Sequence, residues 1–252
     1  MEEAAGSNPA GSTKDMAELK PLIAIITCHK FRDRVEAQRA TWIPEMESMV
    51  PKDKRIDIRF FYGIGPATQR EDETCLPVND SYEALPYKVR AAMKWAIDHG
   101  YNAVFKCDDD TFIFPERFVN DLPTAPYVGR LNKTHMGIAP LGWCSGFGYW
   151  LMGKALEIIA NADTPQHKAE DLWVGSVMSK YGIRCQSNPR LAILSIVHPS
   201  QWHSHRYTMV AACEFPGAKM IEFHRKMRNN EPIEYPKKPK QTFQFGRVIR
   251  KA

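Results

Sequence analysis

The chain has 252 residues, of which 44% are hydrophobic and 25% are charged, and its formal net charge is +5. This is ordinary globular composition, with enough apolar residues to bury a core in one large or two small α/β domains. The mild charge excludes a uniformly basic nucleic-acid coat. Because no run of about 18 consecutive apolar residues is present, no transmembrane segment is predicted.

The N-terminal residues 1–20 are polar and rich in small side chains, and they are predicted to be disordered. They contain neither the basic nor the apolar region of a signal peptide. The six cysteines form no C-x-x-C pair and no metal-ligand spacing. Since a chain of this length does not need disulfides to fold, reduced cysteines are expected.

The first part of the chain alternates predicted strands and helices. Residues 21–30 form a short β-branched apolar run that predicts a buried parallel strand. Residues 31–46 have the apolar spacing of a helix, which Pro44 is expected to bend or end. Residues 55–65 predict a second strand, and residues 66–80 are polar and turn-rich.

The clearest helical pattern covers residues 81–100, with Ser81 as a plausible N-cap and Gly100 directly after the helix. A third predicted strand, residues 101–107, then runs into the aspartate triplet 108–110. The β-α-β-α-β pattern places this triplet at the carboxyl end of a strand, where open α/β sheets bind their ligands.

The second part of the chain is less regular. Residues 142–162 predict a Gly-rich turn, a short strand and a helix, and residues 169–183 predict an amphipathic helix that stops at Gly182. Residues 191–197 and 218–224 predict late strands.

These elements predict one domain over residues 21–236, followed by a basic tail, residues 237–252. The tail carries six Lys or Arg and no acidic residue. Two interpretations stay open: a solvated, partly ordered tail, or a contact for an anionic partner such as an acceptor, a membrane surface or nucleic acid.

The aspartate triplet demands a physical reason, because three adjacent like charges repel one another unless water or a cation screens them. Oxygen ligands at a strand end can bind a hard divalent cation that also contacts substrate phosphates. An ordinary acidic loop is the alternative. The D-D-x-x-D spacing of prenyl-diphosphate enzymes is excluded, because its fifth position is Phe112 here.

A second acidic pair, Glu170 and Asp171, opens the predicted helix 169–183. Carboxylates are favoured there by the helix dipole alone, so these residues are helix-capping groups or include a general base. The late histidines 198, 203, 205 and 224 are, taken singly, more typical of surface or packing positions.

Six short blocks lie in order along the chain: RATW (39–42), RFFYG (59–63), NDSYEALPYKV (79–89), VFKCDDDTFI (104–113), WCSGFGYWL (143–151) and EDLWVG (170–175). Together they resemble glycosyltransferase family 31, which contains the β-1,3-galactosyltransferases, the β-1,3-N-acetylglucosaminyltransferases and Fringe. Ala84, Pro86 and Phe147 depart from the family's pattern. These departures leave the sugar and the acceptor open.

The resemblance implies an α/β fold of GT-A type, with a Rossmann-like nucleotide-binding half and an acceptor-binding half in a single domain. It implies an inverting, metal-dependent transfer of a hexose, Gal or GlcNAc, from a UDP-sugar to the hydroxyl of a glycan or other acceptor, with β linkage. The expected localisation is cytoplasmic for a bacterial or viral relative, or Golgi-type lumenal if an anchor was removed.

The resemblance also assigns site residues. Asp171 is expected to be the catalytic base, with Glu170 orienting or capping. Asp108 and Asp110 are expected to bind Mn²⁺ or Mg²⁺ with a late histidine, either His224 or, as the alternative, His205. Residues expected to contact substrate are Thr27, Arg34, Arg39, Asp80, Lys88, Lys106, Asp108, Asp109, Trp143, Gly146 and Glu170.

Two other functions are compatible with this composition. A non-catalytic module that binds nucleotide sugars or glycans would be expected to lose Asp171 or part of the triplet, and both are present. A metal-dependent nucleotide-sugar hydrolase would need no acceptor-facing helix such as the one that EDLWVG opens.

Overall fold

The computed structural model describes residues 19–50, 56–66, 70–135, 137–194 and 207–233. The predicted disordered segment 1–20, apart from its last two residues, and the basic tail 237–252 therefore lie outside the described residues. Within the described ranges, no helix is long and apolar enough to cross a bilayer.

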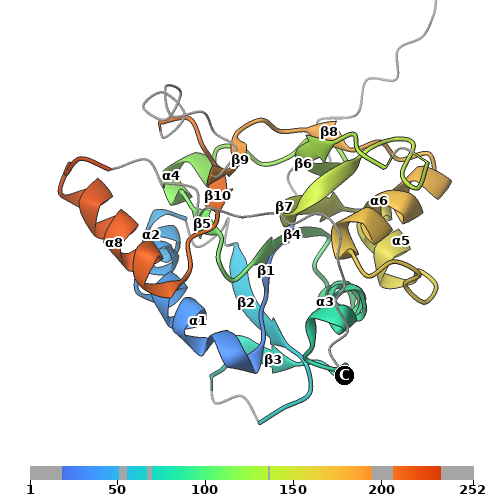
Figure 1. Cartoon of the computed structure of the whole chain (residues 1–252), viewed down its shortest axis with the longest axis horizontal. Helices are drawn as coiled ribbons and strands as arrows, with labels where there is room; N and C mark the ends of the chain where they lie inside the picture. Colours follow the sequence, from blue (N-terminus) through green and yellow to red (C-terminus); the bar gives the residue numbers. More distant parts are fainter. Residues whose placement is uncertain (1–18, 51–55, 67–69, 136, 195–206, 234–252) are drawn as a thin grey trace, which may run out of the picture.

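The described residues form a mixed α/β fold with two sheets (Figure 1). The larger sheet has seven strands in the order β3-β2-β1-β4-β7-β6-β8, and the smaller has the order β5-β10-β9. The strands are β1 (Pro21–Ile26), β2 (Asp57–Tyr62), β3 (Glu73–Cys75), β4 (Ala103–Asp108), β5 (Phe112–Ile113), β6 (Tyr127–Asn132), β7 (Trp143–Met152), β8 (Gln186–Ser187), β9 (Leu191–Ile193) and β10 (Ala211–Cys213).

Helices cover both faces of the larger sheet (Figure 1). On one side lie α1 (Arg32–Arg39), α2 (Trp42–Met49), α4 (Pro115–Phe118) and α8 (Gly217–Arg228). On the other side lie α3 (Leu85–Asp98), α5 (Lys154–Ala160) and α6 (Glu170–Lys180). Two short 3-10 helices, η2 (His29–Phe31) and η4 (Tyr82–Ala84), lead into α1 and α3.

The sequence of β1, residues 21–26, is wholly apolar because the strand is buried on both faces. Alternate side chains of a strand point to opposite faces. Ile23 and Ile25 pack into the core under α1, α2 and α8. Leu22, Ala24 and Ile26 pack into the core under α3, α5 and α6. A central strand covered on both faces has no solvent side, so its sequence does not alternate with polar residues.

The sheet reverses its order between β1 and β4. The chain moves from β1 outward to β2 and β3, and then α3 returns it to the opposite side of β1, where β4 pairs in parallel. Ile26 is the register partner of Asp108, so the residues after both strands lie side by side. Such a switch point opens a crevice at the carboxyl ends of the strands, as predicted for the aspartate triplet.

Several predicted elements are confirmed and others are corrected. The strands at 21–30, 55–65 and 101–107 and the helices at 81–100 and 169–183 are present, and Gly100 and Gly182 follow their helices with positive φ. The helix predicted for 31–46 breaks at Thr41, ahead of Pro44. Pro44 lies in the first turn of α2, where its missing N–H is tolerated.

Three further corrections concern strands. Strand β3 lies in the segment that was predicted to be only turn-rich. Residues 143–152 form a single ten-residue strand instead of a Gly-rich turn followed by a short strand. The predicted strand 218–224 is helical, part of α8, because Met220 and Phe223 are spaced to share one helix face, while Ile221 is 48% exposed.

The expectation of reduced cysteines is wrong for one pair. Cys144 on β7 forms a disulfide with Cys185, just before β8. Cys107 and Cys213 are free thiols, buried in the core as expected for small hydrophobic residues.

Candidate active site

The three aspartates lie at the carboxyl end of β4, where Asp108 ends the strand and the next two residues turn the chain toward β5. Backbone and side-chain contacts hold this turn. The N–H of Thr111 donates to the carbonyl of Asp108 at 3.1 Å. The amide of Gln38, on α1, donates to the Thr111 carbonyl at 3.1 Å. The triplet is thus a fixed feature of the fold.

Asp109 points inward and joins β4 to the elements around β1. Its two carboxylate oxygens accept from the Thr27 hydroxyl at 2.8 Å and from the Arg34 guanidinium at 2.9 Å. Asp109 is only 5% exposed. Because both oxygens have internal partners, Asp109 links the carboxyl end of β4 to Thr27 and Arg34, which differs from its predicted contact with substrate.

Asp108 and Asp110 keep part of their surface in solvent, with side chains 35% and 29% exposed. Burial, followed by the charges of Asp108 and Asp109, raises the pKa of Asp110 to about 7. Among the described residues, Arg34 forms an ion pair with Asp110 at 4.0 Å from a carboxylate oxygen. Within the described residues, Asp110 thus has one long ion pair and two neighbouring carboxylates, an excess of negative charge that a bound cation would relieve.

Lys106 lies under the triplet and is completely buried. Its ammonium donates to Asp108 at 2.6 Å and to the carbonyl of Gly146, and it lies 3.2 Å from Glu170. Burial alone would lower the Lys106 pKa, but the carboxylates of Asp108 and Glu170 raise it, so the ammonium stays charged. Lys106 was predicted to contact substrate; a side chain without solvent access does not fit that role.

The acidic pair at the start of α6 lies beside this lysine. Glu170 is buried and accepts a hydrogen bond from the Tyr149 hydroxyl. Burial raises the Glu170 pKa to about 7, against the opposing effect of Lys106. The carboxylate of Asp171 accepts from the backbone N–H groups of Gly146 at 2.9 Å and of Leu172 at 2.8 Å, and burial raises its pKa.

Gly146 makes this approach possible. A Cβ atom at this position would lie 3.2 Å from an Asp171 carboxylate oxygen and 3.3 Å from a Glu170 oxygen. A side chain at this position would push the α6 carboxylates away by a few tenths of an ångström, so glycine favours the close approach of β7 to the first turn of α6. The structure therefore brings Gly146, Lys106, Asp108, Glu170 and Asp171 into one cluster.

A second cluster is connected to the aspartate triplet through Thr27, whose hydroxyl donates to Asp109. The buried Lys88 ammonium donates to the Thr27 carbonyl at 2.7 Å and to Asp80 at 2.6 Å. Asp80 also accepts from the backbone N–H groups of His29 and Gly63, at 2.7 and 2.6 Å. These contacts hold the loops after β1 and β2 together, and Lys88 is 3% exposed.

Two other predicted site residues have partners outside the carboxylate cluster. Arg39 pairs with Asp72 at 2.8 Å and Glu73 at 3.0 Å, beside β3. The indole of Trp143 donates to the Thr134 carbonyl at 2.9 Å. Neither residue has a described contact with the triplet or with the α6 pair.

The element that carries the preferred metal-binding histidine is corrected. His224 was expected at the end of a strand, but it lies in helix α8, where its ring nitrogen is hydrogen-bonded to Glu45 on α2. The alternative, His205, lies outside the described residues. Within the described ranges, no group of three or more His, Cys, Asp and Glu side chains is arranged to hold a metal.

The residues present still fit a divalent cation that is completed by substrate. Asp108 and Asp110 offer hard oxygen donors at the rim of the switch point. Mg²⁺ commonly binds through one or two carboxylates, substrate phosphates and water, without a complete protein cage. The unbalanced charge at Asp110 suits this arrangement.

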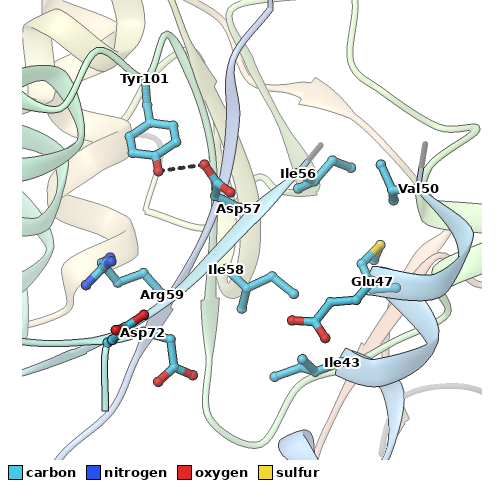
Figure 2. A pocket seen from close by; sticks show the side chains of 11 residues that line it. Ile43, Glu47, Val50, Ile56, Asp57, Ile58, Arg59, Asp72 and Tyr101 are labelled. Carbon is cyan, nitrogen blue, oxygen red and sulfur yellow. Dashed lines mark hydrogen bonds between the residues drawn. The ribbon is translucent and has the colours of Figure 1, made fainter. Parts of the chain in front are cut away.

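A hollow of about 690 Å³ lies elsewhere, between α2 and the first half of β2 (Figure 2). Ile58, Glu47 and Tyr101 are among its lining residues, and the Tyr101 hydroxyl donates to Asp57 at 2.8 Å. The hollow lies near the amino ends of β2 and β4, at the opposite end of the sheet from the aspartates. Its size therefore does not identify the site, whereas the carboxylate cluster does.

Sequence reasoning missed two residues of the cluster. Tyr149, the β7 residue opposite Lys106, holds Glu170, but its position inside an apolar strand gives no sign of this. Gln38 holds the turn of the triplet, and its spacing from the apolar residues of α1 was a signal in the sequence. It is a fully buried polar residue on the same face of α1 as Val35, three residues away.

Residues 33–139 match the family model described as galactosyltransferase. No curated protein matches the chain. The matched segment contains the RATW, RFFYG and NDSYEALPYKV blocks and the aspartate triplet, and it ends before Asp171. The match supports a glycosyltransferase that uses a sugar donor and an acceptor. Over residues 33–139 the chain is thus similar to the galactosyltransferase family, that of the β-1,3-galactosyltransferases of glycosyltransferase family 31.

Proposed function

We propose that this protein transfers a hexose, Gal or GlcNAc, from a UDP-sugar to an acceptor hydroxyl, with inversion to a β linkage and with Mn²⁺ or Mg²⁺ as cofactor. The observation that supports this most is the single cluster formed by the triplet and the α6 acidic pair. Two carboxylate groups from distant parts of the chain meet across Lys106. The aspartate triplet suits the binding of a cation, and the acidic pair of α6 suits a general base.

The donor side of the site consists of Asp108 and Asp110, which would hold the cation. When bound, the cation supplies positive charge that stabilises the departing UDP. Arg34 ends next to both Asp109 and Asp110 and adds a fixed positive charge at the same rim. These residues bind and orient the donor's diphosphate, and Thr27 and Asp109 hold them in place.

The acceptor side consists of Asp171. An inverting transfer needs one base that removes the proton of the acceptor hydroxyl as its oxygen attacks the anomeric carbon from the face opposite UDP. Two backbone N–H groups fix the Asp171 carboxylate at the first turn of α6. Because burial raises its pKa, Asp171 is a stronger base than an ordinary aspartate.

The compartment is also a proposal. Of the two expected localisations, the disulfide between Cys144 and Cys185 favours the lumenal one, because disulfides persist in oxidising compartments. A contact of the basic tail with an anionic acceptor or surface stays a prediction from charge alone.

A transfer assay tests the function. The protein is incubated with Mn²⁺, UDP-Gal or UDP-GlcNAc and a panel of glycan acceptors, beside the variants Asp171→Asn and Asp163→Asn. Asp163 is an exposed aspartate between α5 and α6 and serves as the matched control. We expect Asp171→Asn to lower kcat by about 10²–10⁴-fold, the usual contribution of a general base, with UDP affinity kept.

Three results would contradict the proposal. Equal kcat values of Asp171→Asn and Asp163→Asn would show that Asp171 is not the general base. Donor cleavage at the same rate with and without acceptor would favour the nucleotide-sugar hydrolase. Binding of UDP-sugar without turnover for any acceptor tested would favour the binding module.

A further inference from the structure

Lys106 is the best-enclosed charge in the cluster, and its ammonium has three polar neighbours. An ammonium group has three donors and no acceptor. Lys106 meets three acceptors: the Asp108 carboxylate, the Glu170 carboxylate and the Gly146 carbonyl. Since the side chain is 0% exposed, a substrate has no access to the ammonium in this structure.

These three contacts belong to three elements. Lys106 and Asp108 are two apart on β4, so their side chains share one face of the strand. Glu170 lies in the first turn of α6, and Gly146 lies on β7. One buried charge therefore fixes the relative positions of the metal-binding strand end, the base-bearing helix and the strand between them.

Gly146 carries this constraint to the base. Its carbonyl accepts from Lys106, while its own N–H donates to Asp171 at 2.9 Å. Glu170, next to Asp171 in the chain, is held by Lys106 on one oxygen and by Tyr149 on the other. Asp171 is thus connected to Lys106 both through the backbone of Gly146 and through Glu170.

We propose that Lys106 is a positioning residue, which holds Asp108 and Asp171 at the separation that transfer between donor and acceptor requires. This inference rests on the proposed function. Lys106 touches neither donor nor acceptor, and acts by preorganising the groups that do. A displacement of about 1 Å in such a site can lower turnover by about 10²-fold.

Lys106 also opposes cation binding, and this separates positioning from simple stabilisation. Its positive charge lies beside Asp108, so its removal makes the triplet more negative. A positioning role therefore predicts that removing Lys106 lowers turnover while the affinity for UDP with Mn²⁺ stays equal or becomes tighter. Loss of folded protein would lower both together.

The test uses Lys106→Met, the double variant Lys106→Met/Glu170→Gln and the control Lys94→Met. The double variant removes both members of the buried pair, so Glu170 is not left as an unpaired buried charge, and the fold is disturbed less. Lys94 is an exposed lysine on α3, paired with Asp98, away from the cluster. Circular dichroism and thermal unfolding confirm that each variant is folded.

We expect the double variant to lower kcat by about 10²-fold, with the Kd of UDP in the presence of Mn²⁺ unchanged or smaller, and Lys94→Met to match the wild type. A kcat within twofold of the wild type would overturn the proposal. So would a proportional loss of UDP affinity and turnover, which indicates a purely structural role. Failure of the proposed function is distinguishable, because the wild type itself would then neither bind UDP with Mn²⁺ nor transfer sugar.

Discussion

Replacing Asp110 with asparagine should stabilise the protein in the absence of metal. Burial and the neighbouring carboxylates raise the pKa of Asp110 from 3.8 to about 7. Between these pH values the folded protein binds a proton at Asp110 more readily than the unfolded chain does. The free energy of unfolding therefore falls as the pH rises from about 4 to about 7. The neutral amide of the Asp110→Asn variant would not titrate and would escape this loss.

The magnitude follows from the same shift. One pKa unit corresponds to about 1.4 kcal/mol, so the ceiling is about 4 kcal/mol. The side chain is 29% exposed and loses its attraction to Arg34 on substitution, so water and the lost contact reduce this figure. We expect about 1–2 kcal/mol at pH 8, or about 2–8 °C in Tm, and almost no difference at pH 4.

Thermal unfolding of wild type and Asp110→Asn in EDTA, at pH 4, 6 and 8, measures this effect. Asp163→Asn controls for the loss of one negative charge from the whole protein. The reasoning is refuted if Asp110→Asn is less stable than the wild type at pH 8, or if its advantage does not grow with pH. Either result would mean that Asp110 is well paired in the apo protein.

Three other substitutions test separate parts of the account. Lys88→Met should destabilise the protein by about 1–3 kcal/mol in urea unfolding, because it removes the charged hydrogen bonds to the Thr27 carbonyl and to the partly exposed Asp80; a loss below about 0.5 kcal/mol would contradict this. Gly146→Ala should lower kcat while Gly137→Ala does not, because a Cβ at 146 meets both α6 carboxylates and one at 137 meets nothing within 4 Å; equal rates would refute the close approach. Cys144→Ala opens a 41-residue loop and should lower the free energy of unfolding by about 2–4 kcal/mol, an effect that a reductant should reproduce in the wild type only.

The strands and the place of the site were predictable because they rest on local patterns. The apolar run of β1 requires burial on both faces, and the β-α-β-α-β order then places the triplet at a strand end. The helix α8 was mistaken for a strand because a short apolar run fits both periods. The spacing of Met220 and Phe223 indicates a helix only when both are known to pack into a core on the same side.

The ion pairs within the site could not be predicted from the sequence. Lys106, Lys88 and Arg39 are all cations near acidic residues in the chain, and each was predicted to contact substrate. Their actual partners, such as Glu170 for Lys106 and Glu73 for Arg39, lie 64 and 34 residues away. Such contacts arise from strand order and helix placement, which local patterns do not encode.

The central claim, a cation-dependent donor site at the triplet, is tested most directly by calorimetric titration of UDP into the wild type and Asp110→Asn, each with Mn²⁺ and with EDTA. The account predicts that UDP binds the wild type only in the presence of Mn²⁺ and that Asp110→Asn loses this binding while it remains folded. UDP binding of equal strength in EDTA, or undiminished binding to Asp110→Asn with Mn²⁺, would contradict it.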